Sequence, residues 1–191
     1  MSSLLFIRHA ATDMAGTFCG HSDPPICSSG YLQISALITQ LEAGAFDAIY
    51  CSDLRRAMAT AELLAQRIHI PLTTSPRLRE IYFGEWEGLR WTEIEQRDPA
   101  YALRWSESFP NVPAPGGEAF TAFKKRVLEE VEELLRLPGD TRIAVVTHGG
   151  VMRVVLQTLL GHSEVQAWEL TKSYCSTFTL ARATASQAVI R

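Results

Sequence analysis

The chain has 191 residues, enough for one domain with a sizeable core, and its 47% hydrophobic content is ordinary for a globular protein. A net charge of −3 gives no global attraction to nucleic acid or to an anionic membrane, so any bound anion must be held by locally placed arginines. No apolar run is long enough to span a bilayer, and no signal peptide is expected before the first predicted strand.

The first predicted element is a strand over residues 4–7, which runs directly into Arg8 and His9. A short apolar run of this kind is typical of a strand buried on both faces of a sheet. The same pattern returns in residues 143–147, which are followed by His148 and two glycines. Because open α/β sheets bind ligands at the carboxyl ends of their strands, both histidines are expected at one site.

A long loop over residues 13–29 follows, rich in Gly, Pro, Ser and Asp, and long loops in compact domains are often functional. Residues 30–43 predict a helix that Ser28 or Ser29 caps. Its predicted inward face consists of Leu32, Ala36, Leu37 and Leu41.

Residues 46–68 predict a buried strand and then a helix that carries Arg55 and Arg56 in its first turn. The helix macrodipole disfavours a cation there by about 0.3–1 kcal/mol. A bound anion would remove the conflict, since helix N-termini bind phosphate readily. The alternative is that one arginine is solvated while the other pairs with Asp53 or Asp47.

A short strand over residues 70–74 is followed by an aromatic segment, residues 81–117, which ends in prolines and glycines. Three of the four tryptophans, Trp86, Trp91 and Trp105, fall within it. We interpret this segment as a cap-like insertion over the site, with aromatic rings for walls. The alternative is that the tryptophans form only the core of the insertion itself.

The remaining predicted elements are a helix to about residue 137 with the apolar stripe Val127, Val131, Leu134 and Leu135, the strand before His148, a helix over residues 151–160, and strands 176–181 and 188–190 joined by a hairpin. Strands that alternate with helices predict an α/β fold with a mostly parallel sheet covered on both faces. The final hairpin is expected at the sheet edge.

The candidate site residues are Arg8, His9, Arg55 or Arg56, Glu80 and His148. Arginine forks match phosphate oxygens, and a neutral histidine can attack phosphorus and hold it covalently. Arginines beside His9 would lower its pKa and keep it neutral at pH 7. Glu80 could protonate the leaving oxygen and then activate a water. The arginines supply positive charge, so such a site requires no metal. Taken singly, each residue also fits a structural role.

Four stretches resemble motifs of the histidine phosphatase, or phosphoglycerate-mutase-like, superfamily, in the family's order: Arg8-His9, Ser52 to Ala57 with Thr60-Ala61, Leu78 to Gly88, and Val146 to Gly150. The resemblance selects Arg56 rather than Arg55. It implies a single domain over residues 1–191, with a three-layer α/β/α core and the cap at about residues 81–117.

The resemblance also implies the roles of the site residues: His9 becomes phosphohistidine and Glu80 is acid, then base. It places Arg8, Arg56, His148 and Gly149 around the phosphoryl group, with no metal and no cofactor. The expected partner is a small-molecule phosphomonoester, without nucleic acid or membrane, and the protein is expected to be a monomer or homodimer.

Four positions depart from the family's pattern: Ala10 replaces a usual Gly, Ala11 replaces a common Glu, a minor change, and Ala15 and Thr17 replace a common Asn and Arg. Ala10 is tolerable only if its backbone does not need a positive φ. Either the pocket has fewer phosphate donors or other groups hold the phosphate.

Within the superfamily the chain is similar to the α-ribazole-5′-phosphate phosphatases of cobalamin synthesis, and the short stretch between Glu80 and His148 favours a phosphatase over a mutase. A broad-specificity sugar-phosphate or nucleotide phosphatase, a phosphoglycerate mutase, and a non-catalytic binder of phosphate ligands are the alternatives.

The sequence lacks the residues that cysteine phosphatases, P-loop NTPases and α/β-hydrolases require. No cysteine has an arginine six positions on, and neither a P-loop nor Gly-x-Ser-x-Gly occurs. The cysteines, which show no zinc spacing, are expected as free thiols in a cytoplasmic protein: Cys19, Cys27, Cys51 and Cys175.

Overall fold

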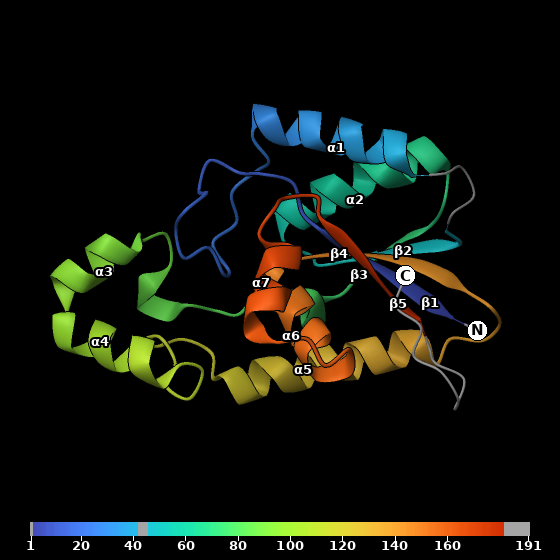
Figure 1. Ribbon diagram of the computed structural model, residues 1–191. Helices are drawn as coiled ribbons and strands as arrows, with labels where there is room; N and C mark the ends of the chain where they lie inside the picture. Colours follow the sequence, from blue (N-terminus) through green and yellow to red (C-terminus); the bar gives the residue numbers. More distant parts are fainter. Residues whose placement is uncertain (1, 42–45, 182–191) are drawn as a thin grey trace.

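The computed structural model describes residues 2–41 and 46–181, which form a five-stranded sheet in the order β3-β2-β4-β1-β5 (Figure 1). The strands are β1 (Ser3–Arg8), β2 (Ala48–Cys51), β3 (Leu72–Thr74), β4 (Arg142–Thr147) and β5 (Thr177–Ala181). Strands β3, β2, β4 and β1 run parallel to one another, and β5 pairs antiparallel with β1 at the edge of the sheet. The predicted fold class is therefore confirmed. The predicted strand over residues 188–190 lies outside the described residues.

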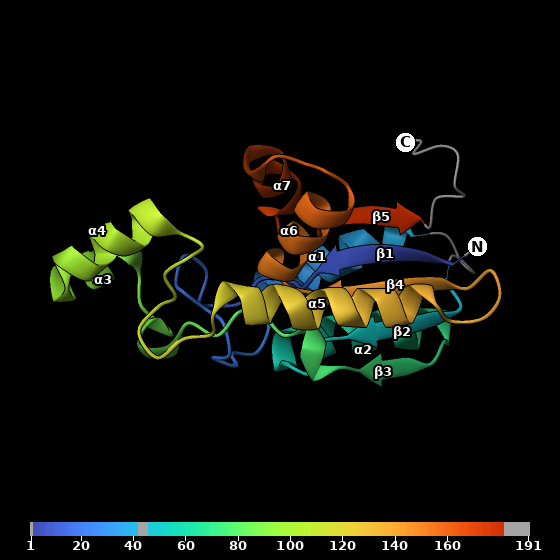
Figure 2. The same ribbon diagram turned by 90° about the horizontal axis from the view of Figure 1, so that it is seen from below.

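Helices cover both faces of the sheet (Figures 1 and 2). The helices are α1 (Ser28–Gln40), α2 (Arg55–Ile68), α3 (Trp91–Arg97), α4 (Pro99–Ser108), α5 (Phe120–Leu135), α6 (Gly149–Leu159) and α7 (Glu164–Thr171), with 3₁₀ turns at Pro76–Leu78 and Gly84–Trp86. On one face α1 and α2 pack, while α5 and α6 pack on the other. Among the described residues no helix is long and apolar enough to cross a membrane.

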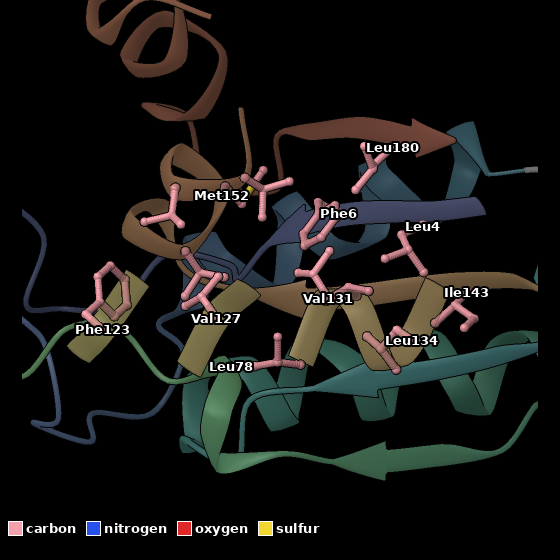
Figure 3. Packing of buried hydrophobic residues seen from close by; sticks show 14 residues of the cluster. Leu4, Phe6, Leu78, Phe123, Val127, Val131, Leu134, Ile143, Met152 and Leu180 are labelled. Carbon is pink, nitrogen blue, oxygen red and sulfur yellow. The ribbon is translucent and has the colours of Figure 1, made fainter. Parts of the chain in front are cut away.

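The two central strands owe their apolar runs to burial on both faces. On β1, Leu4 and Phe6 face α5 and α6, whereas Ile7 faces α1 and α2. Strand β4 follows the same alternation, with Val145 paired opposite Phe6 and Val146 opposite Ile7. The larger cluster, between the sheet and the α5–α6 layer, is shown in Figure 3. This packing fixes where both strands end and thus where their histidines lie.

The buried face of helix α1 matches the predicted one only in part: Leu37 is buried and Leu41 packs against the core as predicted, but Leu32 and Ala36 do not. Its buried residues are Gly30, Ile34 and Leu37, while Leu32 is 73% exposed and Ala36 is also exposed. A Cβ on Gly30 would lie 2.6 Å from the carbonyl oxygen of Ala11, so the helix approaches the first loop too closely for any larger residue. That close approach sets the rotation of the helix. The predicted serine cap is also wrong, because Cys27 is the N-cap and makes no side-chain cap bond.

Helix α7 was not expected from the sequence. It begins after Ser163, whose hydroxyl accepts the Gln166 amide while the Gln166 side chain accepts the Ser163 amide. This reciprocal capping box is a local signal that could have revealed the helix. Its short length and weak amphipathicity concealed it, and only Ala167 and Thr171 are buried.

The aromatic segment, residues 81–117, carries α3 and α4 away from the sheet (Figure 2). Its tryptophans pack on one another and on Phe18 of the first long loop, with ring centroids 5.2 Å apart for Trp86 and Trp105. Trp86 is 6% exposed and belongs to a cluster with Ile94 and Ala102. The tryptophans therefore form a core of their own, and Trp105 also lines a cavity described below.

Candidate active site

The site lies where β1 and β4 end. Because the two strands are paired in parallel register, Arg8 lies opposite Thr147 and the chain leaves both strands at the same edge. The amide of His9 donates to the Thr147 carbonyl at 2.8 Å. The rings of His9 and His148, both buried, have centroids 5.0 Å apart. The structure thus brings the two histidines together from opposite ends of the sequence.

His9 is held as a neutral imidazole with one defined tautomer. Its Nδ1 lies 2.7 Å from the Ala10 carbonyl oxygen, which can only accept, so Nδ1 carries the proton and Nε2 keeps its lone pair. Arg56 Nε donates to that Nε2 at 3.3 Å. Burial lowers the pKa of His9 well below its ordinary value, and the charges of Arg56 and Arg8 lower it further. Arginines were expected to cause this shift, but burial is the larger cause.

Two buried nitrogens beside His9 lack a hydrogen-bond partner among the described residues: Nε of Arg8 and Nδ1 of His148. The other ring nitrogen of His148, Nε2, lies 2.9 Å from the hydroxyl of Ser52. Burial lowers the pKa of His148 well below its ordinary value, with Arg56 the next cause. Buried polar atoms are nearly always paired in folded proteins, so two unpaired nitrogens at one place indicate a ligand that forms hydrogen bonds with both.

Arg56, rather than Arg55, enters the site. It is 1% exposed, and its terminal nitrogens donate to the carbonyls of Cys19, Gly20 and Ser22. The expected alternative, an arginine paired with Asp53 or Asp47, is wrong because these carboxylates bind arginines elsewhere in the fold: Arg79 and Arg142. The long first loop is thereby tied to the start of α2.

Glu87 also binds the first loop, through backbone amides rather than carbonyls. Its carboxylate accepts the backbone amides of Gly20, His21, Ser22 and Phe83 at 2.8–3.1 Å. Burial would raise the pKa of Glu87, but these hydrogen bonds outweigh it and the pKa is lowered. Its bonds to four amides make Glu87 a structural carboxylate. The sequence places Glu87 in the motif stretch Leu78 to Gly88 but does not indicate this role.

Glu80 faces the N-terminus of α6, next to the histidines. Its Oε2 accepts the Gly150 amide at 2.8 Å and its Oε1 accepts the Ile81 amide at 3.0 Å. A Cβ on Gly150 would overlap Oε1, so only glycine admits the carboxylate here. Gly150 belongs to the motif stretch Val146 to Gly150, but the sequence does not predict it as a site residue. Gly149, a predicted site residue, lies beside Arg8: a Cβ built on Gly149 would be 3.7 Å from Arg8 Nε.

The backbone that carries Glu80 is held by Arg126 of α5. This guanidinium donates to the carbonyls of Arg77, Arg79 and Glu80 at 2.7–2.9 Å. Its charge is balanced by Glu118, which it meets through both Nε and Nη2. No sequence motif pointed to Arg126, because its partners are main-chain groups.

Arg8 is held by the unexpected helix α7. Its Nη1 donates to the carbonyls of Thr171 and Lys172 at 2.9 and 2.6 Å, at the C-terminal end of that helix, where the macrodipole favours a cation. Its guanidinium also lies 4.3 Å from the centre of the Tyr174 ring, which packs on His9 as well. The terminal nitrogen is thus occupied while Nε remains free for a ligand.

A cavity of about 680 Å³ adjoins the site at Gly150. Its walls come from the first loop, the aromatic segment, and helices α5, α6 and α7, and include Phe18, Phe83, Trp105, Phe109, Phe120, Phe123, Arg153, Val165 and Trp168. Seven of the 16 residues that line this cavity are aromatic. A cavity of this size accommodates a drug-sized organic molecule.

The departures at positions 10, 15 and 17 have a structural explanation in part. Ala10 is fully buried and does not have a positive φ, so the replacement of glycine causes no backbone strain. The hydroxyl of Thr17 donates to the Met14 carbonyl, and Ala15 has no polar side chain, so neither position supplies a charged donor. Charged hydrogen-bond donors to a bound phosphate must therefore come from other residues than these.

Comparison with known proteins identifies a family and several relatives. The sequence model of the "Histidine phosphatase superfamily (branch 1)" matches residues 4–191. The "Adenosylcobalamin/alpha-ribazole phosphatase" of Salmonella typhimurium LT2 is 30% identical over 167 residues, covering 86% of this chain and 83% of the relative. The protein of the same name from Escherichia coli K12 is 31% identical over 167 residues, with 86% and 82% covered.

Among solved structures, the alpha-ribazole phosphatase from Shigella flexneri superposes with a TM-score of 0.83 at 28% identity, covering 93% of this chain and 89% of that one. The match of the family model over nearly the whole chain agrees with the resemblance seen in the four motifs. The chain belongs to the histidine phosphatase superfamily, branch 1, and the prediction that it is a phosphatase is confirmed.

Proposed function

We propose that this phosphatase hydrolyses small phosphomonoesters through a phosphohistidine on His9, without a metal ion. In the first step Nε2 of His9 attacks phosphorus, the bond from phosphorus to the ester oxygen breaks, and Glu80 gives its proton to that oxygen. In the second step water attacks phosphorus, the bond from phosphorus to Nε2 of His9 breaks, and one proton of the water passes to the Glu80 carboxylate. Inorganic phosphate and neutral His9 are regenerated.

The observation that carries this proposal is the state of His9. A nucleophilic imidazole needs an unprotonated ring nitrogen, and the hydrogen bond from Nδ1 to the Ala10 carbonyl leaves Nε2 unprotonated. The lowered pKa keeps the ring neutral at pH 7. Arg56 Nε, Arg8 Nε and, if the Ser52 hydroxyl donates to its Nε2, His148 Nδ1 would donate to the phosphoryl oxygens as charge moves onto them.

For the substrate we propose α-ribazole 5′-phosphate, a flat base on a sugar phosphate. The aromatic walls of the cavity suit a planar base, and its volume of about 680 Å³ exceeds what a three-carbon phosphate requires. The Salmonella and Escherichia relatives, both named adenosylcobalamin/alpha-ribazole phosphatase, support the same substrate. Hydrolysis by this chain would place it in the nucleotide-loop branch of cobalamin synthesis.

The first experiment measures p-nitrophenyl phosphate hydrolysis in excess EDTA for wild type, His9→Ala and the control His69→Asn. His69 is exposed at the end of α2 with φ 55°, a conformation that asparagine tolerates. We expect metal-independent turnover that only His9→Ala abolishes, together with an acid-labile, alkali-stable phosphate label on wild type after a quench. Retained hydrolysis by His9→Ala would refute the covalent mechanism.

The second experiment compares kcat/KM for α-ribazole 5′-phosphate, phosphoserine and 3-phosphoglycerate, and monitors release of free phosphate. A preference for α-ribazole 5′-phosphate supports the proposed substrate, while equal values indicate a broad-specificity phosphatase. Isomerisation of phosphoglycerate without release of phosphate would indicate a mutase. Tight binding of phosphate without turnover of any ester would indicate a non-catalytic binder.

A further inference from the structure

Arg153 lies at the junction between the two histidines and the aromatic cavity. It is one turn beyond Gly149 on α6, on the same helix face, and long side chains on a helix lean toward its N-terminus. Its Nη1 lies 3.3 Å from the point where a Gly149 Cβ would be, and Arg8 Nε lies 3.7 Å from the same point. The two guanidinium groups therefore converge beside Gly149, and Arg153 also lines the cavity.

The charge of Arg153 is not neutralised in the described parts of the chain. Its guanidinium forms neither a hydrogen bond nor an ion pair there, and its recorded contact is with the Trp168 ring, 5.2 Å from the ring centre. Glu164 lines the same cavity without forming an ion pair with it. Two cations beside one small glycine repel each other unless an anion lies between them.

We propose that Arg153 donates hydrogen bonds to the phosphoryl oxygens of the substrate from the cavity side. This inference rests on the proposed function, which places the phosphoryl group against Arg8 and His148. Arg153 would supply the charge that Ala15 and Thr17 do not provide. Trp168 stacks on the guanidinium and holds it over Gly149, and this stacking leaves the N–H edge of the arginine free for oxygen.

The test is the affinity for inorganic phosphate, measured by calorimetry on wild type, Arg153→Gln, Arg153→Lys and the control Arg104→Gln. Arg104 also stacks on an aromatic ring, Tyr101 at 4.4 Å, but it is exposed and does not line the cavity. We expect phosphate to bind about tenfold more weakly to Arg153→Gln, the low end for a charged hydrogen bond because Arg153 is only half-buried. Arg153→Lys should recover part of the loss.

Kinetics give a second readout. If Arg153 binds the phosphoryl group equally in ground and transition states, KM of every phosphomonoester rises while kcat changes by less than about threefold. Unchanged phosphate affinity in both Arg153 variants would overturn the proposal. A KM increase confined to carboxylate-bearing esters such as phosphoserine would also overturn the proposal, because Arg153 would then bind the alcohol part of the substrate rather than its phosphoryl group.

The calorimetry requires no turnover, so it separates this inference from the mechanism. Loss of phosphate affinity in Arg153→Gln supports the inference even if His9→Ala still hydrolyses the ester. A wild type that binds no phosphate would overturn this inference, while the assay of His9→Ala in EDTA would still decide the mechanism. Circular dichroism and thermal midpoints of the Arg153 and Arg104 variants show whether each is folded.

Discussion

Replacement of Gly150 by alanine tests the geometry that places Glu80. A Cβ on Gly150 would overlap Oε1 of Glu80 and lie 2.9 Å from Cδ and 3.1 Å from Oε2. The carboxylate cannot retreat without losing the 2.8 Å bond that Oε2 accepts from the Gly150 amide. We therefore expect the alanine methyl group to push the carboxyl group away from the two histidines.

The expected magnitude follows from these contacts. Overpacking at a closely packed site costs roughly 1–3 kcal/mol of unfolding free energy. If Glu80 is the general acid and base, its displacement lowers kcat by roughly 10²–10⁴-fold, close to the effect of Glu80→Gln. KM should change by only a few-fold, since the groups that hold the phosphoryl oxygens stay in place.

The assay is a double-mutant cycle of Gly150→Ala and Glu80→Ala, with kcat on p-nitrophenyl phosphate and urea unfolding for all four proteins. Glu80→Ala vacates the space that the methyl group needs, so adding Gly150→Ala should cost no further activity. The stability effect should change sign, because alanine is favoured over glycine in a helix by up to about 1 kcal/mol. Additive losses, or wild-type kcat in Gly150→Ala, would refute the reasoning.

Three further predictions concern the groups around the site. His9→Asn should reduce the loss of stability on acidification below pH 6, measured by urea unfolding. The unfolded histidine takes up a proton below about pH 6.5, whereas burial lowers the pKa of the folded His9, so this group makes wild type lose up to about 1.4 kcal/mol per pH unit as the pH falls. An unchanged slope would contradict the lowered pKa. Arg126→Gln should lower kcat more than it raises KM and leave the Kd for phosphate unchanged. The reason is that the carbonyls of Arg77, Arg79 and Glu80 lose their donor. An altered Kd for phosphate would argue against this positioning role. Glu87→Gln should destabilise the protein by roughly 1–3 kcal/mol in thermal and urea unfolding, as amides of the first loop lose charged acceptors, and no destabilisation would contradict its structural role.

The strands were predictable because their burial leaves a local trace in the sequence. Both β1 and β4 are covered on two faces, so nearly every residue of each is apolar until the polar residue that ends it. The rotation of α1 was not predictable, because Leu32 and Ile34 are both apolar and only the close approach of Gly30 to the first loop selects the inward face.

The choice between Arg55 and Arg56 shows the same division. Both arginines occupy the first turn of α2, and their local sequence does not distinguish them. The resemblance to a known family favoured Arg56. The physical reason is in the fold: carbonyls of the first loop surround Arg56, whereas Arg55 is exposed and donates its backbone amide to Asp23.

The sequence by itself determined the layered α/β fold, the family, and which reactive side chains stand at the ends of the two central strands, since apolar runs and motif residues are local properties of the chain. Only the tertiary structure decided what holds those side chains. Arg8 is fixed by carbonyls at the end of α7, and the backbone of Glu80 by Arg126. These partners are distant in sequence and mostly main-chain groups, which every residue carries, so no pattern of side chains could reveal them.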